Sequence, residues 1–101
     1  MRKLRKVIWS ERALYALKSH HDRIALDSKS AAKKVTNQIL KAASEIPPYA
    51  EKYQIDEYYP SNPGNIRRLF RWSFRIVYQI NDDTIDILNV VHTSQEPNKN
   101  P

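Results

Sequence analysis

The segment from Arg67 to His92 constrains the fold more than any other part of the chain. Apolar and polar residues alternate along it, and short breaks at Trp72-Ser73 and Asp82-Asp83 divide it into three runs. Successive residues of a strand point to opposite faces of a sheet, and Asp tolerates the backbone conformations that tight turns need. The segment therefore predicts an antiparallel meander of three strands joined by two tight hairpins.

The two turns set a register, and the register divides the side chains between two faces, which a one-residue slip would exchange. The predicted core face collects the large apolar residues Leu69, Phe74, Ile76, Tyr78, Ile80, Ile85, Ile87 and Val91. The opposite face is mixed and collects Arg68, Phe70, Arg75, Val77, Leu88, Val90 and His92. On this face we expect Arg75 to oppose Val90. Guanidinium groups beside a histidine suit contact with phosphates.

The N-terminal half predicts a strand followed by two helices. Residues 4–9 form an apolar strand, and Ser10 is a suitable N-cap for the first helix. That helix carries an apolar stripe at three-four spacing, formed by Leu14, Leu17, His21 and Ile24. His20 then lies on the exposed side. Adjacent helical residues diverge by roughly 100°, so this histidine pair is not expected to hold a metal ion.

The second predicted helix starts at Ser28 or Ser30, either of which can cap it. Its stripe consists of Ala32, Val35, Ile39, Ala42 and Ile46. Pro47-Pro48 ends it, because proline cannot continue a helix. Residues 49–65 show no periodicity and predict a loop. The expected fold class is α+β, with two N-terminal helices packed on a small, mainly antiparallel, curved sheet.

Length and charge restrict the class of protein. A chain of 101 residues suits a single domain, spanning 1–101. The net charge of +6 favours polyanionic partners or an acidic protein that masks the charge. Without cysteine, disulfides and thiolate metal sites are excluded. We expect a cytoplasmic protein with no cofactor, no metal and no membrane contact.

These residues resemble the RelE/ParE superfamily of bacterial type II toxins. The specific matches are FRIVYQI, Phe74 to Ile80, and TIDILNVVHTSQEP, Thr84 to Pro97. Members often carry a similar Arg-Ile-Val-Tyr run in the central strand and a Val-x-His-Thr-Ser-Arg-Glu-Pro run after the last strand. The likeness covers nearly the whole chain in layout but is specific in the C-terminal third. It implies a cognate antitoxin that wraps the toxin in a hetero-oligomer.

The resemblance implies one of two activities. RelE-like members cleave mRNA on the ribosome, whereas ParE-like members poison DNA gyrase. For metal-free mRNA cleavage, the main expectation, Arg75 would grip the phosphate and His92 would transfer a proton, since imidazole titrates near neutral pH. The residues expected to bind nucleic acid are Arg67, Arg68, Arg71, Trp72 and Lys52.

Two departures from the RelE-like pattern support the alternative activity. Gln95 stands where many relatives carry an arginine, and the tail lacks the tyrosine or histidine that some nuclease members place there. One of Glu51, Lys52 and Glu57 could supply a base or a cation, but their spacing does not select among them. A gyrase inhibitor and an inactive antitoxin-binding module therefore remain as alternatives.

Overall fold

The computed structural model describes residues 4–95, which form an α+β fold. In chain order the elements are β1 (Lys6–Trp9), α1 (Glu11–Ala25), α2 (Lys29–Ser44), the 3-10 turn η1 (Pro47–Tyr49), β2 (Gln54–Ile55), β3 (Ile66–Arg71), β4 (Phe74–Ile80), β5 (Thr84–His92) and the 3-10 turn η2 (Thr93–Gln95). Among these residues the strands form one five-stranded sheet in the order β1-β5-β4-β3-β2, with β1 parallel to β5 and the other pairs antiparallel. The predicted fold class is confirmed.

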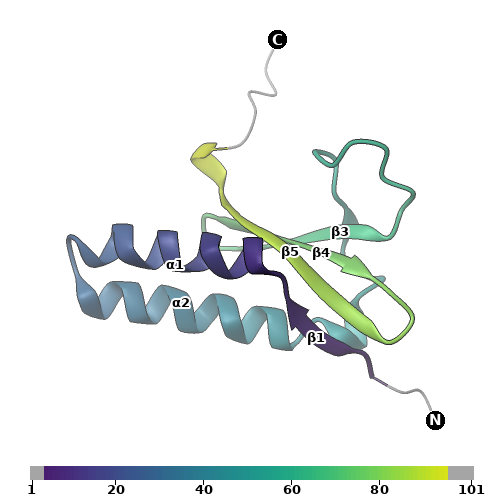
Figure 1. Ribbon diagram of the computed structural model, residues 1–101, viewed down its shortest axis with the longest axis horizontal. Coiled ribbons are helices and arrows are strands. Elements are labelled where there is room, and N and C mark those ends of the chain that lie inside the picture. Colours follow the sequence, from purple (N-terminus) through teal and green to yellow (C-terminus); the bar gives the residue numbers. More distant parts are fainter. Residues whose placement is uncertain (1–3, 96–101) are drawn as a thin grey trace.

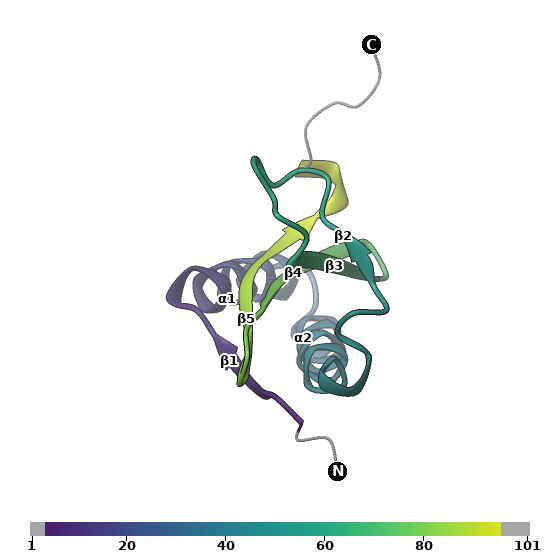
Figure 2. The same cartoon turned by 90° about the vertical axis from the view of Figure 1, so that its right-hand side faces the viewer.

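The two helices form a hairpin that packs on one face of the sheet and projects beyond it at the α1–α2 turn (Figure 1). The connection between β2 and β3 rises on the side of the sheet away from the helices, near the C-terminal end of β5 (Figure 2). One face of the sheet is therefore covered by helices, while a loop partly covers the other. No helix within residues 4–95 is long and apolar enough to cross a membrane.

Both helices begin at a serine cap. The Ser10 hydroxyl accepts the Ala13 N–H at 3.1 Å, and the Ser28 hydroxyl accepts the Ala31 N–H at 3.1 Å. Of the two serines that the sequence offered for α2, Ser28 is the cap.

The buried stripe of α1 differs from the predicted one. Ala13 and Leu17 are buried, whereas Leu14 is 50% exposed. His20, predicted to be exposed, is partly buried and donates from Nε2 to the Val90 carbonyl at 2.8 Å. His21 is partly buried, as its place in the predicted stripe implies, and its Nδ1 lies 3.1 Å from the exposed carboxylate of Asp22. The buried stripe instead includes the small residue Ala13, which belongs to the core cluster at the side of α1 that packs on the sheet.

The predicted register holds for the first part of the meander. Trp72-Ser73 joins β3 to β4, with Arg68 opposite Val77 and Phe70 opposite Arg75, as predicted. The Asn81 N–H donates to the Thr84 carbonyl at 2.9 Å, which confirms the turn at Asp82-Asp83. Tyr78 opposes Ile87, also as predicted.

A β-bulge then shifts the register of β5 by one residue. Tyr78 pairs with Ile87, but Val77 pairs with Asn89, so Leu88 is the extra residue. Arg75 consequently opposes Val91 instead of Val90. The N–H of Val90 is accepted by the Asn89 side chain at 2.8 Å, which satisfies a donor beside the bulge.

The bulge exchanges the faces of the last β5 residues. Val90 is buried at 2% exposure and takes the core place predicted for Val91. His92 pairs with Phe74 and so lies on the helix-covered face, not beside Arg75. The predicted faces are therefore wrong for Val90, Val91 and His92, because one inserted residue reverses a pattern of period two.

The core lies between the helical hairpin and the sheet. Its large, fully buried members include Tyr78, Ile39, Ile46, Ile76, Ile85 and Ile87. The Tyr78 hydroxyl donates to the Ala50 carbonyl at 2.7 Å, and its burial raises the pKa of that phenol. This bond joins Ala50, the residue that follows η1, to β4. The segment predicted as a loop also contributes the short strand β2, which pairs with Arg67 and Arg68.

Candidate functional site

Arg75 occupies the face of the sheet away from the helices, as predicted, but it is buried. Its guanidinium forms an ion pair with Asp56, and the two side chains are 7% and 1% exposed. The guanidinium also lies over the Tyr58 ring, 4.6 Å from its centroid. Asp56 begins the connection to β3, and Asn62 anchors that connection by donating to the Asp56 and Ile66 carbonyls. The loop thus brings a carboxylate directly onto Arg75.

Arg68 lies on the same face as Arg75 and is also paired. It donates to the Glu57 carboxylate at 2.8 and 3.0 Å and to the Gln54 side chain at 3.0 Å. Its guanidinium stacks over Phe70, 4.9 Å from the ring centroid. A pocket of about 380 Å³ opens beside the Arg75–Asp56 pair and is lined by Arg12, Tyr58, Tyr59, Leu88, Asn89 and Val91, among others.

Arg67 and Arg71 lie on the other side of β3, by their pairing with Tyr78 and Phe74. Arg67 connects β3 to the chain before and after β2. Its guanidinium donates to the carbonyls of Glu51 at 2.6 Å, Tyr53 at 2.8 Å and Gly64 at 3.2 Å. The Arg71 Nε is buried with no hydrogen-bond partner within residues 4–95. The arginine cluster of the sequence is therefore divided between two faces.

His92 packs on the helix-covered face in a cluster of three rings. The His20 and His92 rings meet Phe74 edge-to-face, at centroid distances of 5.0 and 5.1 Å. The Ser94 N–H donates to His92 Nδ1 at 3.1 Å, and the Ser94 hydroxyl lies 2.7 Å from the same atom. Nδ1 is thus an acceptor, and the neutral ring carries its proton on Nε2.

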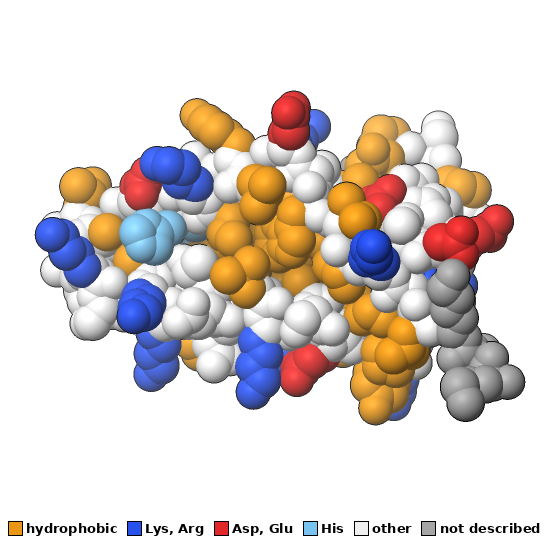
Figure 3. All heavy atoms as spheres, turned by 60° about the horizontal axis from the view of Figure 1, so that its bottom comes forward, with side chains coloured by type: hydrophobic (Ala, Val, Ile, Leu, Met, Phe, Trp, Pro, Cys, Tyr) orange, Lys and Arg blue, Asp and Glu red, His pale blue; other side chains and the backbone are white. Residues whose placement is uncertain are grey.

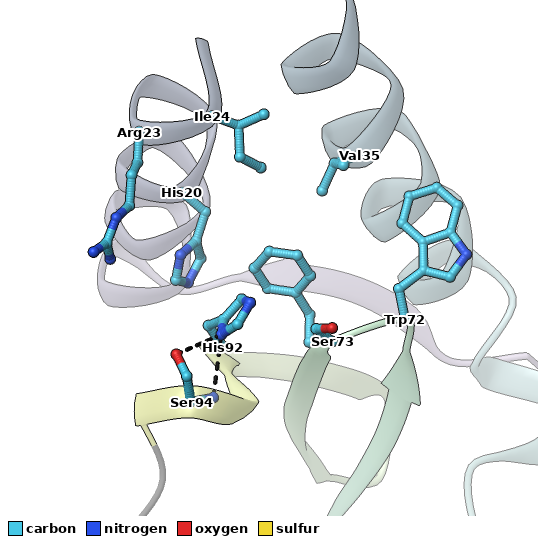
Figure 4. A pocket seen from close by; sticks show the side chains of 9 residues that line it. His20, Arg23, Ile24, Val35, Trp72, Ser73, His92 and Ser94 are labelled. Carbon is cyan, nitrogen blue, oxygen red and sulfur yellow. Dashed lines mark hydrogen bonds between the residues drawn. The ribbon is translucent and has the colours of Figure 1, made fainter. Parts of the chain in front are cut away.

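The rings of His20, Phe74 and His92 line part of a second pocket, of about 460 Å³. Figure 4 shows His20, Arg23 and Ile24 approaching from α1, Val35 from α2, Trp72 from the β3–β4 turn and His92 from the end of β5. Trp72 is 54% exposed and forms one side of this pocket. Lys52 lies elsewhere, beside Tyr49, with its Nζ 5.6 Å from the ring centroid.

The structure does not bring the two predicted catalytic residues together. Arg75 and His92 lie on opposite faces of the sheet, and the roles assigned to them stay predictions. Sequence reasoning overlooked Asp56, which stands in a segment without periodicity and is one of several acidic residues there. It also placed His20 on the exposed side of α1, away from the site. The one available signal was the three-four spacing of Ala13, Ala16, Leu17 and His20, which competes with the stripe through Leu14.

The helical side of the molecule carries a separate apolar surface. Figure 3 shows hydrophobic side chains gathered near the middle of this side, with Lys and Arg side chains around them. A groove of about 420 Å³ on β1 and the end of α2 is lined mainly by Leu4, Val7, Trp9, Leu40, Pro47 and Pro48. Leu4 and Leu40 are 59% and 39% exposed, and Leu14 on α1 adds to the exposed apolar area.

Comparison with known proteins supports one family. Residues 7–97 match the family model described as the ParE toxin of the type II toxin-antitoxin system, parDE. Among solved structures, a chromosomal ParDE TA system from P. aeruginosa matches with a TM-score of 0.73 at 19% sequence identity, covering 88% of this chain and 96% of that chain. At that identity the likeness concerns the fold alone.

No curated protein matches this chain. The RelE/ParE resemblance of the C-terminal motifs is confirmed by the family model, although Glu96 and Pro97 at the end of the motif lie outside the described residues. Because that model spans nearly the entire chain, the protein belongs to the ParE toxin family of type II toxin–antitoxin systems.

Proposed function

We propose that the protein arrests bacterial growth by inhibiting DNA gyrase and that a cognate antitoxin neutralises it. A toxin–antitoxin family implies the antitoxin. The RelE/ParE superfamily has an mRNA-cleaving branch and a gyrase-poisoning branch. The family model that matches this chain describes a ParE toxin, which belongs to the second branch. The observation that carries the choice of gyrase is the state of Arg75, which is buried in an ion pair instead of facing a phosphate.

The Arg75–Asp56 pair is poorly suited to phosphate binding. The paired side chains carry no net charge, and a phosphate would have to displace a carboxylate that is 1% exposed. Displacement would leave Asp56 buried without its partner, which is strongly unfavourable. RNA cleavage also needs a proton-transfer group within reach of the same phosphate. His92 cannot provide one beside Arg75 while it packs against Phe74 on the opposite face.

Gln95 supports the same choice. Its side-chain oxygen accepts the His92 N–H at 3.4 Å, so this residue takes part in the turn that follows β5. A neutral amide at this position cannot offset the charge that develops on phosphate. Many relatives carry an arginine at this position. In this chain Gln95 instead stabilises a local turn and supplies no positive charge.

Ribosome-dependent mRNA cleavage is the second candidate. It is favoured by the joint placement of Arg68 and Arg75 on one face, beside a pocket with Tyr58 and Tyr59 that could stack on bases. An inactive antitoxin-binding module is the third. The three differ in what the purified protein does, so one set of assays separates them.

The test combines growth with two biochemical assays. Expression of the chain alone should arrest growth, and co-expression with the small protein encoded beside it should restore growth. Purified protein should block supercoiling of relaxed plasmid by gyrase from the same bacterium. In a coupled translation reaction the message should stay intact by primer extension. Cleaved message with normal supercoiling would reverse the proposal in favour of the nuclease, and normal growth at confirmed soluble expression would leave the inactive module.

A further inference from the structure

Trp72 sits in a backbone conformation that its side chain disfavours. Its φ is 54°, in the left-handed region, at the first position of the two-residue turn between β3 and β4. Glycine normally takes such a position because a Cβ there is crowded. For a bulky aromatic residue this φ is a genuine outlier, and backbone strain of this kind gathers at functional sites.

Packing against the chain itself does not account for the strained tryptophan. The side chain is 54% exposed, so much of its apolar surface meets solvent in the free protein. Large exposed aromatic residues are the commonest anchors of protein interfaces. A tryptophan held at a hairpin tip with half its surface free is consequently better explained by a partner than by the core.

The pocket beside Trp72 has apolar walls and a basic rim. Ile24, Val35 and Phe74 supply the walls. Arg23 from α1 supplies the positive charge, and the imidazole rings of His20 and His92 add polar edges (Figure 4). None of the described residues that line it is acidic. Arg23 is exposed and makes no ion pair with any residue between 4 and 95. The pocket thus complements an apolar side chain that has a carboxylate next to it.

We infer that Trp72 and this pocket dock the toxin on its protein target, by receiving an acidic, apolar segment of that target. The inference rests on the proposed function for the identity of the target, gyrase. The strained backbone of Trp72 is present in the toxin without a partner. This free form of the toxin is the one that would bind the target. An alternative apolar surface for the antitoxin lies on the helical side and in the groove beside β1.

The experiment compares substitutions that separate the aromatic contact from the backbone strain. Trp72→Gly removes the anchor and also relieves the left-handed strain, whereas Trp72→Phe keeps an aromatic ring at the same position. Gyrase inhibition by Trp72→Gly should fall on the order of tenfold or more, with a Tm within about 4 °C of wild type. Trp72→Phe should keep most of the inhibition.

A charge reversal tests the rim independently. Arg23→Glu should weaken inhibition, and the loss should shrink at high salt because exposed charges are screened. Lys41→Glu is the matched control, since it makes the same change in net charge on an exposed residue of α2 outside the pocket. Equal loss in both variants would mean that only the net charge matters and would overturn the rim assignment.

Growth arrest is measured beside gyrase inhibition, so that the docking inference can be tested even if the target is not gyrase. If wild-type protein arrests growth without inhibiting gyrase, the proposed function fails, and the inference is judged on growth alone. Loss of arrest in Trp72→Gly at normal stability and normal antitoxin binding supports the inference. Full growth arrest by Trp72→Gly overturns the inference. If that variant arrests growth but no longer binds the antitoxin, the pocket belongs to the antitoxin interface, and the inference is likewise overturned. A fall in Tm well beyond 4 °C that accompanies the loss of inhibition would show that Trp72 is structural.

Discussion

Replacing Arg75 by methionine should destabilise the protein strongly. Methionine keeps the length of the aliphatic part of arginine but leaves the Asp56 carboxylate, 1% exposed, without its cation. Breaking a buried ion pair on one side costs about 3–5 kcal/mol. A domain of this size has roughly 5–15 kcal/mol of total stability, so the variant should lose a large fraction of it.

Urea denaturation followed by tryptophan fluorescence or circular dichroism measures this effect. With a slope of about 1–3 kcal/mol per molar urea, a loss of about 4 kcal/mol lowers the midpoint by roughly 2 M. The double variant Arg75→Met with Asp56→Ala leaves no unpaired buried charge. It should recover at least about 2 kcal/mol relative to Arg75→Met alone.

Arg68→Met provides the matched control on the same face. Its partner Glu57 is 48% exposed and stays hydrated when the guanidinium is removed, so the loss should stay below about 1 kcal/mol. The reasoning is refuted if Arg75→Met costs less than Arg68→Met, or if the Asp56 and Arg75 substitutions simply add. Either result would mean that the Arg75–Asp56 pair carries little coupling energy, and the case against the nuclease would weaken.

Two further predictions concern stability. Tyr78→Phe removes the donor to the Ala50 carbonyl and should cost about 1–2 kcal/mol. Because burial raises the pKa of Tyr78 above its ordinary value near 10, wild-type Tm should fall as pH rises past about 10, and Tyr78→Phe should show a weaker fall between pH 8 and 11. Ser28→Ala should cost about 1 kcal/mol by removing the cap of α2. Ser30→Ala should cost less than half of that in the same urea titration, and equal losses would contradict the cap assignment.

The fold was largely predictable from the sequence because local signals agree with one another. The alternation from Arg67 to Ile87, the serine caps and Pro47-Pro48 each specify an element by short-range chemistry. The two tight turns then specify which strands are neighbours. The parallel pairing of β1 with β5 is a long-range contact between Lys6 and Thr84 at its first step, and no local pattern indicates it.

The site was harder to predict for two physical reasons. The bulge after Ile87 has no glycine to mark it, and Asn89 satisfies the neighbouring N–H with its own side chain. The partner of Arg75 comes from a segment without periodicity, whose path depends on Asn62 contacts to Asp56 and Ile66. Pattern reasoning placed Arg75 on the correct face but could not show that a loop covers it.

The single extra residue in β5 decides which chemistry the molecule can offer. Without the bulge, His92 would stand on the face of Arg75, in the arrangement that a phosphate-cleaving site needs. With it, His92 joins His20 around Phe74 and helps to form the basic pocket beside Trp72. The residue set that resembles a nuclease is thus divided between an ion pair on one face and the pocket beside Trp72 on the other. That division fits the proposed protein target better than RNA cleavage, since binding needs an anchor and a complementary charge but no proton transfer.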